Sequence, residues 1–190
     1  MPPPQKTPFS DRRHREFLYL REIDAIIAAT AQTRHPIRNQ ALAMLLFCQA
    51  LQPVELCWLL WRDLNLTENN PRLRLARNRS QPNPHQTQVL VNLQPLCPAE
   101  VKVLQQLQVQ RTTEWLFASE RQQRLSERSL HHLIHQAGKI SQIPFPIHPY
   151  MLRRSGLYYR AARRHKATCH NPCSSCSGNS WTNLDMPEYK

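Results

Sequence analysis

The chain has 190 residues, and its 25 lysines and arginines outnumber its 13 aspartates and glutamates, which gives a formal net charge of +12. A chain of this length can bury one hydrophobic core, and the positive charge favours a polyanionic partner such as nucleic acid. No apolar run approaches the roughly 20 residues of a membrane span, and the basic, proline-rich start lacks the apolar stretch of a secretory signal. We therefore expect a cytoplasmic protein with reduced thiols and no membrane contact.

The first half of the chain predicts a tail followed by three helices. Residues 1–16 contain three consecutive prolines and a basic run, which is typical of a flexible tail. From Leu20 onward, apolar residues recur at helical spacing and predict an amphipathic helix. Pro36 begins a second helix that is apolar on nearly every side, as a buried central helix would be. Pro53 suits the first turn of a third helix, which we expect to run through Leu60.

The hydrophobic period then changes. Residues 72–77 alternate arginine with apolar side chains, residues 88–93 alternate more loosely, and turn-forming residues separate the two runs. This pattern predicts an antiparallel hairpin with one basic face. Further helices are expected to start at Pro98, Ser126 and Tyr150. The predicted fold is therefore mainly α-helical with a small antiparallel β-hairpin.

The composition shifts again after Lys166, where the sequence becomes small, polar and rich in cysteine. We therefore divide the chain into the basic, proline-rich tail at 1–16, a folded domain at 17–166 and a divergent cysteine-rich segment at 167–190.

Two groups of residues have side chains that can bind metals. The C-terminal group spaces Cys169, Cys173 and Cys176 closely, with His165 and His170 beside them, and could supply four zinc ligands. Structural zinc sites usually consist of two separated pairs, however, so we interpret this group as a C-terminus that has diverged. The second group lies on one predicted helix and consists of His131, His132 and His135. No carboxylate accompanies it, so we expect structural or surface histidines and no metal.

Four local sequences resemble successive landmarks of the tyrosine recombinase (phage integrase) family: FLYLREIDAIIAA, LQPVELCWLLWRDLNL, EWLFASERQQRLS and HPYMLRRSG. The resemblance covers about residues 16–160 and is strongest to the short fimbrial-switch invertases, which lack a separate N-terminal core-binding domain. It implies that residues 17–166 form an integrase-like catalytic domain. It also implies that the protein binds double-stranded DNA as a homo-oligomer. In this family a tyrosine hydroxyl attacks a DNA phosphate and forms a 3′-phosphotyrosyl link, without metal or cofactor.

The resemblance assigns five positions to the catalytic site. Arg153 matches the second catalytic arginine, and Tyr150 stands where the family has histidine or lysine. Gln52 stands at the first catalytic arginine, and glutamine has neither the charge nor the guanidinium fork. Loss of a transition-state cation typically costs about 10³-fold in rate. In the last segment, Trp181 takes the histidine-or-tryptophan position and Tyr189 the position of the nucleophile.

The resemblance also implies phosphate contacts from arginines on the hairpin and on the last predicted helix. These candidates are Arg77, Arg79, Arg154, Arg160, Arg163 and Arg164. The hairpin has no lysine to protonate the leaving oxygen, and arginine is a poor proton donor because its pKa exceeds about 12. Outside the site, we expect Cys48 and Cys57 to be core residues, and Trp58 and Trp61 to serve core or subunit packing rather than base stacking.

Two hypotheses follow. The first is a site-specific recombinase that cleaves and rejoins DNA through Tyr189 and Arg153, with activity impaired by Gln52. The second is a catalytically inactive DNA-binding relative that keeps the fold and the basic cleft. A third, a zinc-dependent nucleic-acid binder built on the C-terminal cysteines, has less support in the sequence.

Overall fold

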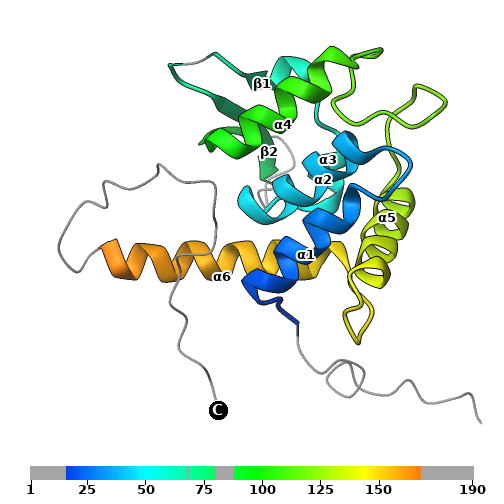
Figure 1. The fold of residues 1–190 in the computed structure, drawn as a ribbon. Coiled ribbons are helices and arrows are strands. Elements are labelled where there is room, and N and C mark those ends of the chain that lie inside the picture. The colour runs from blue at the N-terminus through cyan, green and yellow to red at the C-terminus, as the bar shows by residue number, and fades with distance from the viewer. Residues whose placement is uncertain (1–15, 68, 80–87, 168–190) are drawn as a thin grey trace, which may run out of the picture.

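The computed structural model describes residues 16–67, 69–79 and 88–167, of which 76–79, 88–90 and 163–167 are described as backbone only. The elements in chain order are α1 (Leu20–Thr30), α2 (Pro36–Cys48), α3 (Pro53–Cys57), the 3-10 helix η2 (Trp61–Asp63), β1 (Leu64–Asn65), β2 (Arg72–Arg79), β3 (Gln88–Pro95), α4 (Pro98–Val109), α5 (Glu127–Ile140) and α6 (Pro149–Ala167) (Figure 1). Within this part of the chain no helix is long and apolar enough to cross a membrane.

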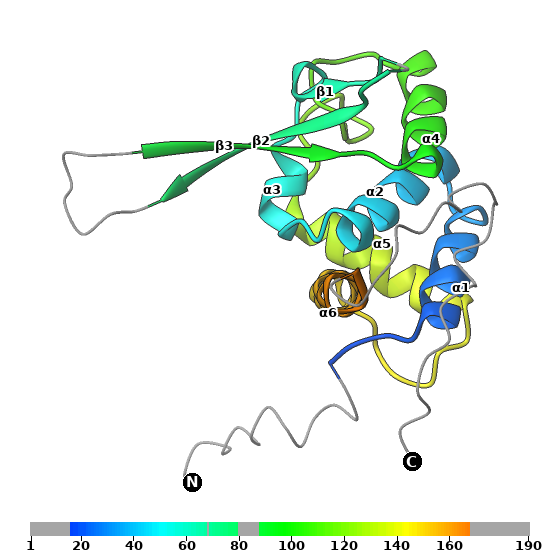
Figure 2. The same ribbon diagram turned by 90° about the vertical axis from the view of Figure 1, so that its left-hand side faces the viewer.

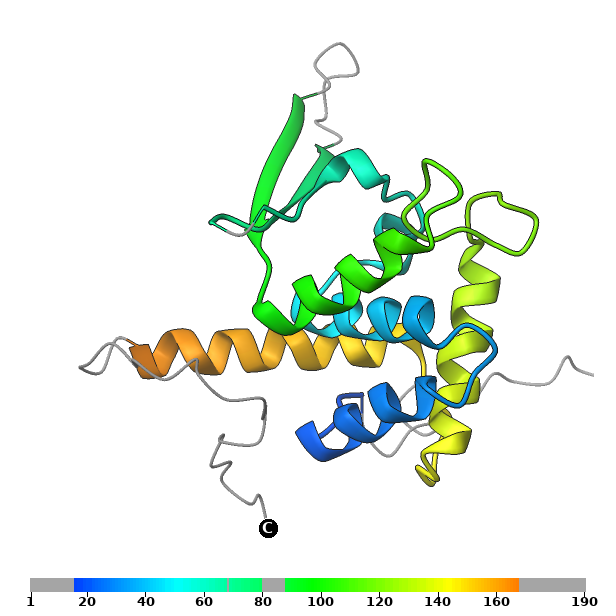
Figure 3. The same cartoon turned by 45° about the horizontal axis from the view of Figure 1, so that its top comes forward.

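Helix α2 is the centre of the domain, as its apolar sequence predicts. Every residue from Ala41 to Phe47 is buried. Helices α1, α4 and α6 all pack against it, and Figure 3 shows α4 and α6 on its two sides. Burying a leucine side chain contributes about 1.5–3 kcal/mol, so the run of leucines and methionine in α2 supplies much of the core.

The crossing of α2 and α6 is unusually close. Gly156 of α6 lies so near α2 that a Cβ atom built there would overlap the carbonyl oxygen of Phe47. Next to this contact, the rings of Phe47 and Tyr159 meet edge to face, with centroids 5.9 Å apart. On the same buried face of α6, Ser155 Oγ accepts a 2.7 Å hydrogen bond from the backbone N–H of Leu18. The crossing therefore fixes α6 against both α2 and the start of the domain.

The sheet is antiparallel in the order β1-β2-β3. Along β2, Leu73 and Leu75 are buried whereas Arg72 and Arg74 are exposed, which is the predicted alternation. Opposite Arg74 on β3 lies Leu93, which is also exposed, so the outer face of the sheet is basic and apolar together. The far end of the hairpin projects from the body of the domain (Figure 2).

The predicted helix starts are confirmed, except that α6 begins at Pro149, one residue before the predicted Tyr150. Proline stands in the first turn of α2, α3 and α4, where its missing N–H costs nothing. Ser126 is the N-cap of α5, and its side chain accepts a hydrogen bond from the backbone N–H of Ser129.

The predicted length of the third helix is wrong, because α3 ends at Cys57 and does not reach Leu60. The backbone beyond it is extended and pairs with a segment far along the chain. Leu116 donates its N–H to Leu59 O at 2.9 Å, and Trp61 donates to Glu114 O at 3.0 Å. Strand β1, which follows, was not predicted. Both differences arise from pairing between distant segments, which a helical period does not reveal.

Replacement of Gly156 by alanine tests the close crossing. Alanine is the better helix former by about 1 kcal/mol, so helix propensity alone would stabilise the variant. We expect the opposite, a loss of about 1–3 kcal/mol in the free energy of unfolding, because the added methyl group forces α6 away from Phe47. Urea unfolding followed by circular dichroism measures the change. The matched control is Ala161→Gly on the exposed side of the same helix, which should lose only about 1 kcal/mol. A stabilised Gly156→Ala protein would contradict the close crossing.

Candidate functional site

Arg153 lies on α6, one turn before the close crossing at Gly156. Its neighbours Met151 and Leu152 are buried in the core, whereas Arg153 itself is half-buried at the flank of the helix. Its Nε atom is buried and has no hydrogen-bond partner in the part of the chain that the structure describes. A buried guanidinium N–H without an acceptor is costly, and an anionic group bound at this place would satisfy it.

Gln52 lies at the N-terminus of α3 and is exposed. It follows the end of α2 by a turn in which Ala50 takes the left-handed conformation, with φ of 49°. Its backbone N–H donates a 2.8 Å hydrogen bond to Glu55 Oε2, which caps the first turn of α3. Leu51 and Pro53 on either side are buried. The backbone at position 52 is therefore anchored, but the side chain that it presents is uncharged.

Aromatic and imidazole rings gather where α5 meets the start of α6. The ring of His131 on α5 lies 6.4 Å from that of His148 and 6.3 Å from that of Tyr150, centroid to centroid. The resemblance places Tyr150 where the family has histidine or lysine, and the fold brings the imidazole of His131 beside it. The only sequence signal for His131 was its histidine-rich helix, which we interpreted as structural or surface. Among the described residues, no group of three or more His, Cys, Asp or Glu side chains is arranged to hold a metal ion.

The candidate phosphate-binding arginines differ in their surroundings. Arg154 is exposed and forms an ion pair with Glu16, from the segment before α1. Arg77 and Arg79 lie on β2, at the projecting part of the hairpin. Two more, Arg163 and Arg164, lie on the last turns of α6. Only the backbone is described for Arg77, Arg79, Arg163 and Arg164.

Arg160 is turned toward the core instead. Its guanidinium donates hydrogen bonds to the carbonyl oxygen of Cys48 and, at 3.1 Å, to Gln49 Oε1. These bonds tie α6 to the C-terminal end of α2, where helical carbonyls lack partners within the helix. Gln49 in turn donates to both carboxylate oxygens of Glu100 at 2.8 and 2.9 Å. Burial raises the pKa of Glu100 to about 8.

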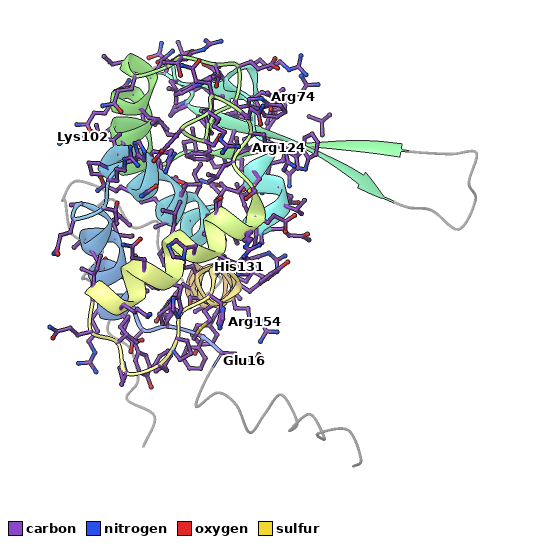
Figure 4. All side chains as sticks on the ribbon, turned by 90° about the vertical axis from the view of Figure 1, so that its right-hand side faces the viewer. Glu16, Arg74, Lys102, Arg124, His131 and Arg154 are labelled. Carbon is purple, nitrogen blue, oxygen red and sulfur yellow. The ribbon has the colours of Figure 1, made fainter. Side chains whose placement is uncertain are left out.

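Basic side chains from several elements lie on one side of the domain. In Figure 4, Arg74, Arg124, His131 and Arg154 lie along the side from which the hairpin projects, whereas Lys102 lies on the opposite side. They come from β2, the loop before α5, α5 itself and α6. These four residues, far apart in the sequence, thus lie toward one side of the domain, which we call its basic face, and Glu16 lies there too.

Trp58, at the end of α3, is 55% exposed. It is therefore not a core residue of the domain, whereas Trp61 is buried as expected. The guanidinium carbon of Arg124 lies 4.1 Å from the centre of the Trp58 ring, a cation–π contact. The Trp58 ring also packs edge to face against that of Trp115, with centroids 5.9 Å apart, and its predicted role in subunit packing remains a prediction.

The model of the phage integrase family matches residues 16–158. The chain belongs to the phage integrase family. The type 1 fimbriae regulatory protein FimB from Escherichia coli strain K12 is 29% identical over 153 residues, which cover 77% of this chain and 71% of FimB. FimB from E. coli O157:H7 matches equally well. These relatives confirm the resemblance to the fimbrial-switch branch of the family.

Solved structures of tyrosine recombinases share the fold. XerA recombinase has a TM-score of 0.62 and 22% identity, and the match covers 77% of this chain and 51% of XerA. The lambda integrase catalytic core has a TM-score of 0.61 and 16% identity, with coverage of 78% of this chain and 85% of the core. The chain thus spans about half the length of XerA. These likenesses confirm the predicted fold, that of a tyrosine recombinase catalytic domain.

The match to the phage integrase family includes three of the five predicted catalytic positions and leaves two outside it. Gln52, Tyr150 and Arg153 lie within the matched residues 16–158. Trp181 and Tyr189 lie beyond them and also outside the described residues, as do the C-terminal cysteines and most of the N-terminal tail. The catalytic and DNA-contact roles of all these residues remain predictions.

Replacement of Arg160 by methionine tests whether this arginine stabilises the fold through its bonds to α2. Because the variant leaves Cys48 O and the Gln49 side chain without their donor, we expect the free energy of unfolding to fall by about 1–3 kcal/mol. Arg154→Met is the control, since it removes only an exposed ion pair and should cost under about 1 kcal/mol. Chemical denaturation of both variants measures the difference. Equal losses would show that the bonds of Arg160 to α2 contribute nothing.

Proposed function

We propose that this chain is the catalytic domain of a site-specific tyrosine recombinase, which binds double-stranded DNA and cleaves and rejoins its strands as a homo-oligomer. The single observation that carries the proposal is Arg153: a half-buried cation whose Nε has no acceptor among the described residues, within the HPYMLRRSG segment of a phage integrase domain. Relatives with this fold support it, because XerH is solved bound to its difH substrate and lambda integrase as a tetramer on a Holliday junction.

In the proposed reaction the Tyr189 hydroxyl attacks a DNA phosphate, which forms a 3′-phosphotyrosyl bond and releases the 5′-hydroxyl. The guanidinium of Arg153 binds the non-bridging oxygens and offsets the negative charge that grows in the transition state. The strand is rejoined when a 5′-hydroxyl attacks the phosphotyrosine, so the energy of the broken bond is conserved and no cofactor is needed.

Tyr150 can donate a hydrogen bond to the phosphate, but a phenol side chain cannot supply a positive charge. The ring of His131 lies beside Tyr150 and also beside that of His148, so imidazole N–H groups lie near this end of α6. The basic face that includes Arg74, Arg124 and Arg154 supports a role in binding the DNA backbone.

A second candidate function is favoured by Gln52. The family's first catalytic arginine is replaced by an exposed, uncharged side chain at the start of α3. A domain without this cation would still hold DNA on its basic face but would cleave it slowly. We therefore keep a catalytically inactive DNA-binding relative as the alternative.

A trap for the covalent intermediate distinguishes the two functions. Pooled nicked duplexes from the flanks of the gene are incubated with the full chain and resolved on a denaturing gel. A recombinase gives a slow protein–DNA band that Tyr189→Phe abolishes without weakening DNA binding. Tyr158→Phe is the control, because Tyr158 is an exposed tyrosine outside the predicted catalytic positions, and it should leave the band intact.

The same samples are analysed on native gels at rising salt. Absence of the covalent band together with binding that weakens steeply with salt would favour the inactive relative. Absence of salt-sensitive binding to any duplex of the pool would count against both functions.

Restoration of the missing cation tests how far the site has diverged. We expect Gln52→Arg to raise the yield of covalent adduct by about 10²-fold, because a guanidinium at this position would stabilise the transition state. The rate of adduct formation in single-turnover experiments measures the gain. Gln105→Arg, at an exposed position of α4, controls for the added charge alone. No gain from Gln52→Arg, or an equal gain from Gln105→Arg, would show that position 52 is not limiting.

A further inference from the structure

A cavity of about 160 Å³ lies where α2, α4 and α6 meet. Its lining includes two cysteines, Cys48 and Cys97, the buried acid Glu100 and the core-facing Arg160. Nothing in the proposed recombination reaction uses this group of side chains. Two thiols and an acid in one small cavity form a candidate site for chemistry of their own.

The two thiols come from distant parts of the chain. Cys48 is the last residue of α2, and Cys97 is the N-cap of α4. Neither forms a disulfide, and both are half-buried. Their side chains interact directly with each other. The packing of α4 on α2 thus brings together a pair of reduced sulfur atoms at the wall of a cavity.

The surroundings make the two thiols unequal. The side-chain hydrogen bond from Cys48, together with hydrogen bonds from Glu100 and the backbone of Ala99, lowers the pKa of Cys97 to about 6 despite its burial. The same thiol–thiol hydrogen bond and burial raise the pKa of Cys48 well above its usual value. Cys97 is therefore the thiolate of the pair at neutral pH, Cys48 is the thiol, and Glu100 carries a proton.

Cys57 provides a contrast within the chain. Its side chain is 1% exposed, and burial raises its pKa to about 11. It has neither a thiolate at neutral pH nor access to solvent, so it should be inert. The features that distinguish Cys97 are thus its position at a helix N-terminus, its neighbouring thiol and its cavity.

We propose that the cavity is an oxidative modification site, in which Cys97 is the nucleophile toward small peroxides and Cys48 resolves the product to an intramolecular disulfide. This inference does not depend on the proposed recombinase activity. The Cys97 thiolate attacks one oxygen of hydrogen peroxide, and the leaving hydroxide takes a proton from Glu100 and departs as water. Glu100, now a carboxylate, takes the proton of Cys48, and the Cys48 thiolate attacks the sulfur of the Cys97 sulfenic acid. The hydroxide that leaves takes this proton back from Glu100 and departs as a second water. Two thiols are thereby oxidised by two electrons, and one peroxide is reduced.

The disulfide would fix the segment that carries Gln52. Cys48 lies four residues before Gln52, and its carbonyl accepts the hydrogen bond from Arg160. A covalent link from Cys48 to α4 restrains the end of α2 and closes a long loop, which restricts the unfolded chain. We expect the oxidised domain to melt at a higher temperature than the reduced one.

The test uses the full chain, reduced and then treated with hydrogen peroxide at neutral pH. Free thiols are blocked with iodoacetamide, and the protein is digested with trypsin and Glu-C, which separates Cys48 from Cys57 by cleavage after Glu55. Mass spectrometry without reduction should find a peptide that joins Cys48 to Cys97, while Cys57 stays alkylatable after unfolding. Before oxidation, Cys97 should react with iodoacetamide at least about tenfold faster than Cys57.

Two variants separate the roles of the thiols. In Cys48→Ala the sulfenic acid at Cys97 should persist and be captured by dimedone, whereas Cys97→Ser should show neither the adduct nor the disulfide. Circular dichroism shows whether each variant is folded. If a variant does not fold, the disulfide mapping and the thiol reactivities of the unmodified chain decide the proposal. A disulfide from Cys97 to a C-terminal cysteine, equal reactivity of Cys97 and Cys57, or no link between Cys48 and Cys97 would each overturn the proposal.

Discussion

The close crossing of α2 and α6 is the contact on which the other features depend. It requires a residue without a side chain, and Gly156 meets that requirement opposite the backbone of Phe47. One helical turn before it stands Arg153, and one turn after it Arg160 bonds to the end of α2. Of these two half-buried arginines, Arg160 is bonded to the end of α2, whereas the Nε of Arg153 has no partner among the described residues.

This arrangement divides the arginines of α6 by role. The guanidinium of Arg160 donates from Nη2 to the carbonyl of Cys48 and to the side chain of the buried Gln49, and these bonds stabilise the fold. Arg154 is paired with Glu16 in the free domain, and this exposed pair would have to separate before Arg154 met DNA. Such a pair is weak in water, so a phosphate can replace the carboxylate at little cost.

The site combines retained and altered chemistry. Arg153 has a guanidinium whose Nε has no partner among the described residues, whereas Gln52, which the resemblance places at the family's first catalytic arginine, is uncharged. The imidazoles of His131 and His148 lie near the end of α6 that carries Tyr150, which the resemblance places at the family's histidine or lysine. On another flank of α6, the cavity lined by Cys48, Cys97 and Glu100 is also lined by Gly156 and Arg160 of the same helix. A movement at the end of α2 would shift both the cavity and Gln52, because Cys48 lines the cavity and α2 leads into the turn before Gln52.

The sequence by itself determined the features that depend on neighbouring residues, namely where helices start and which helix is central, and it indicated the family. Proline in the first turn marked the starts of α2, α3 and α4, the apolar period marked the central helix, and four ordered segments indicated the phage integrase family. Only the tertiary structure decided which side chains meet. The early end of α3, strand β1, the exposure of Trp58, the inward turn of Arg160 and the pairing of Cys48 with Cys97 all depend on segments tens of residues apart. Helical period and proline position report backbone preference within a few residues, whereas such contacts are fixed by how helices cross and how much space each side chain leaves.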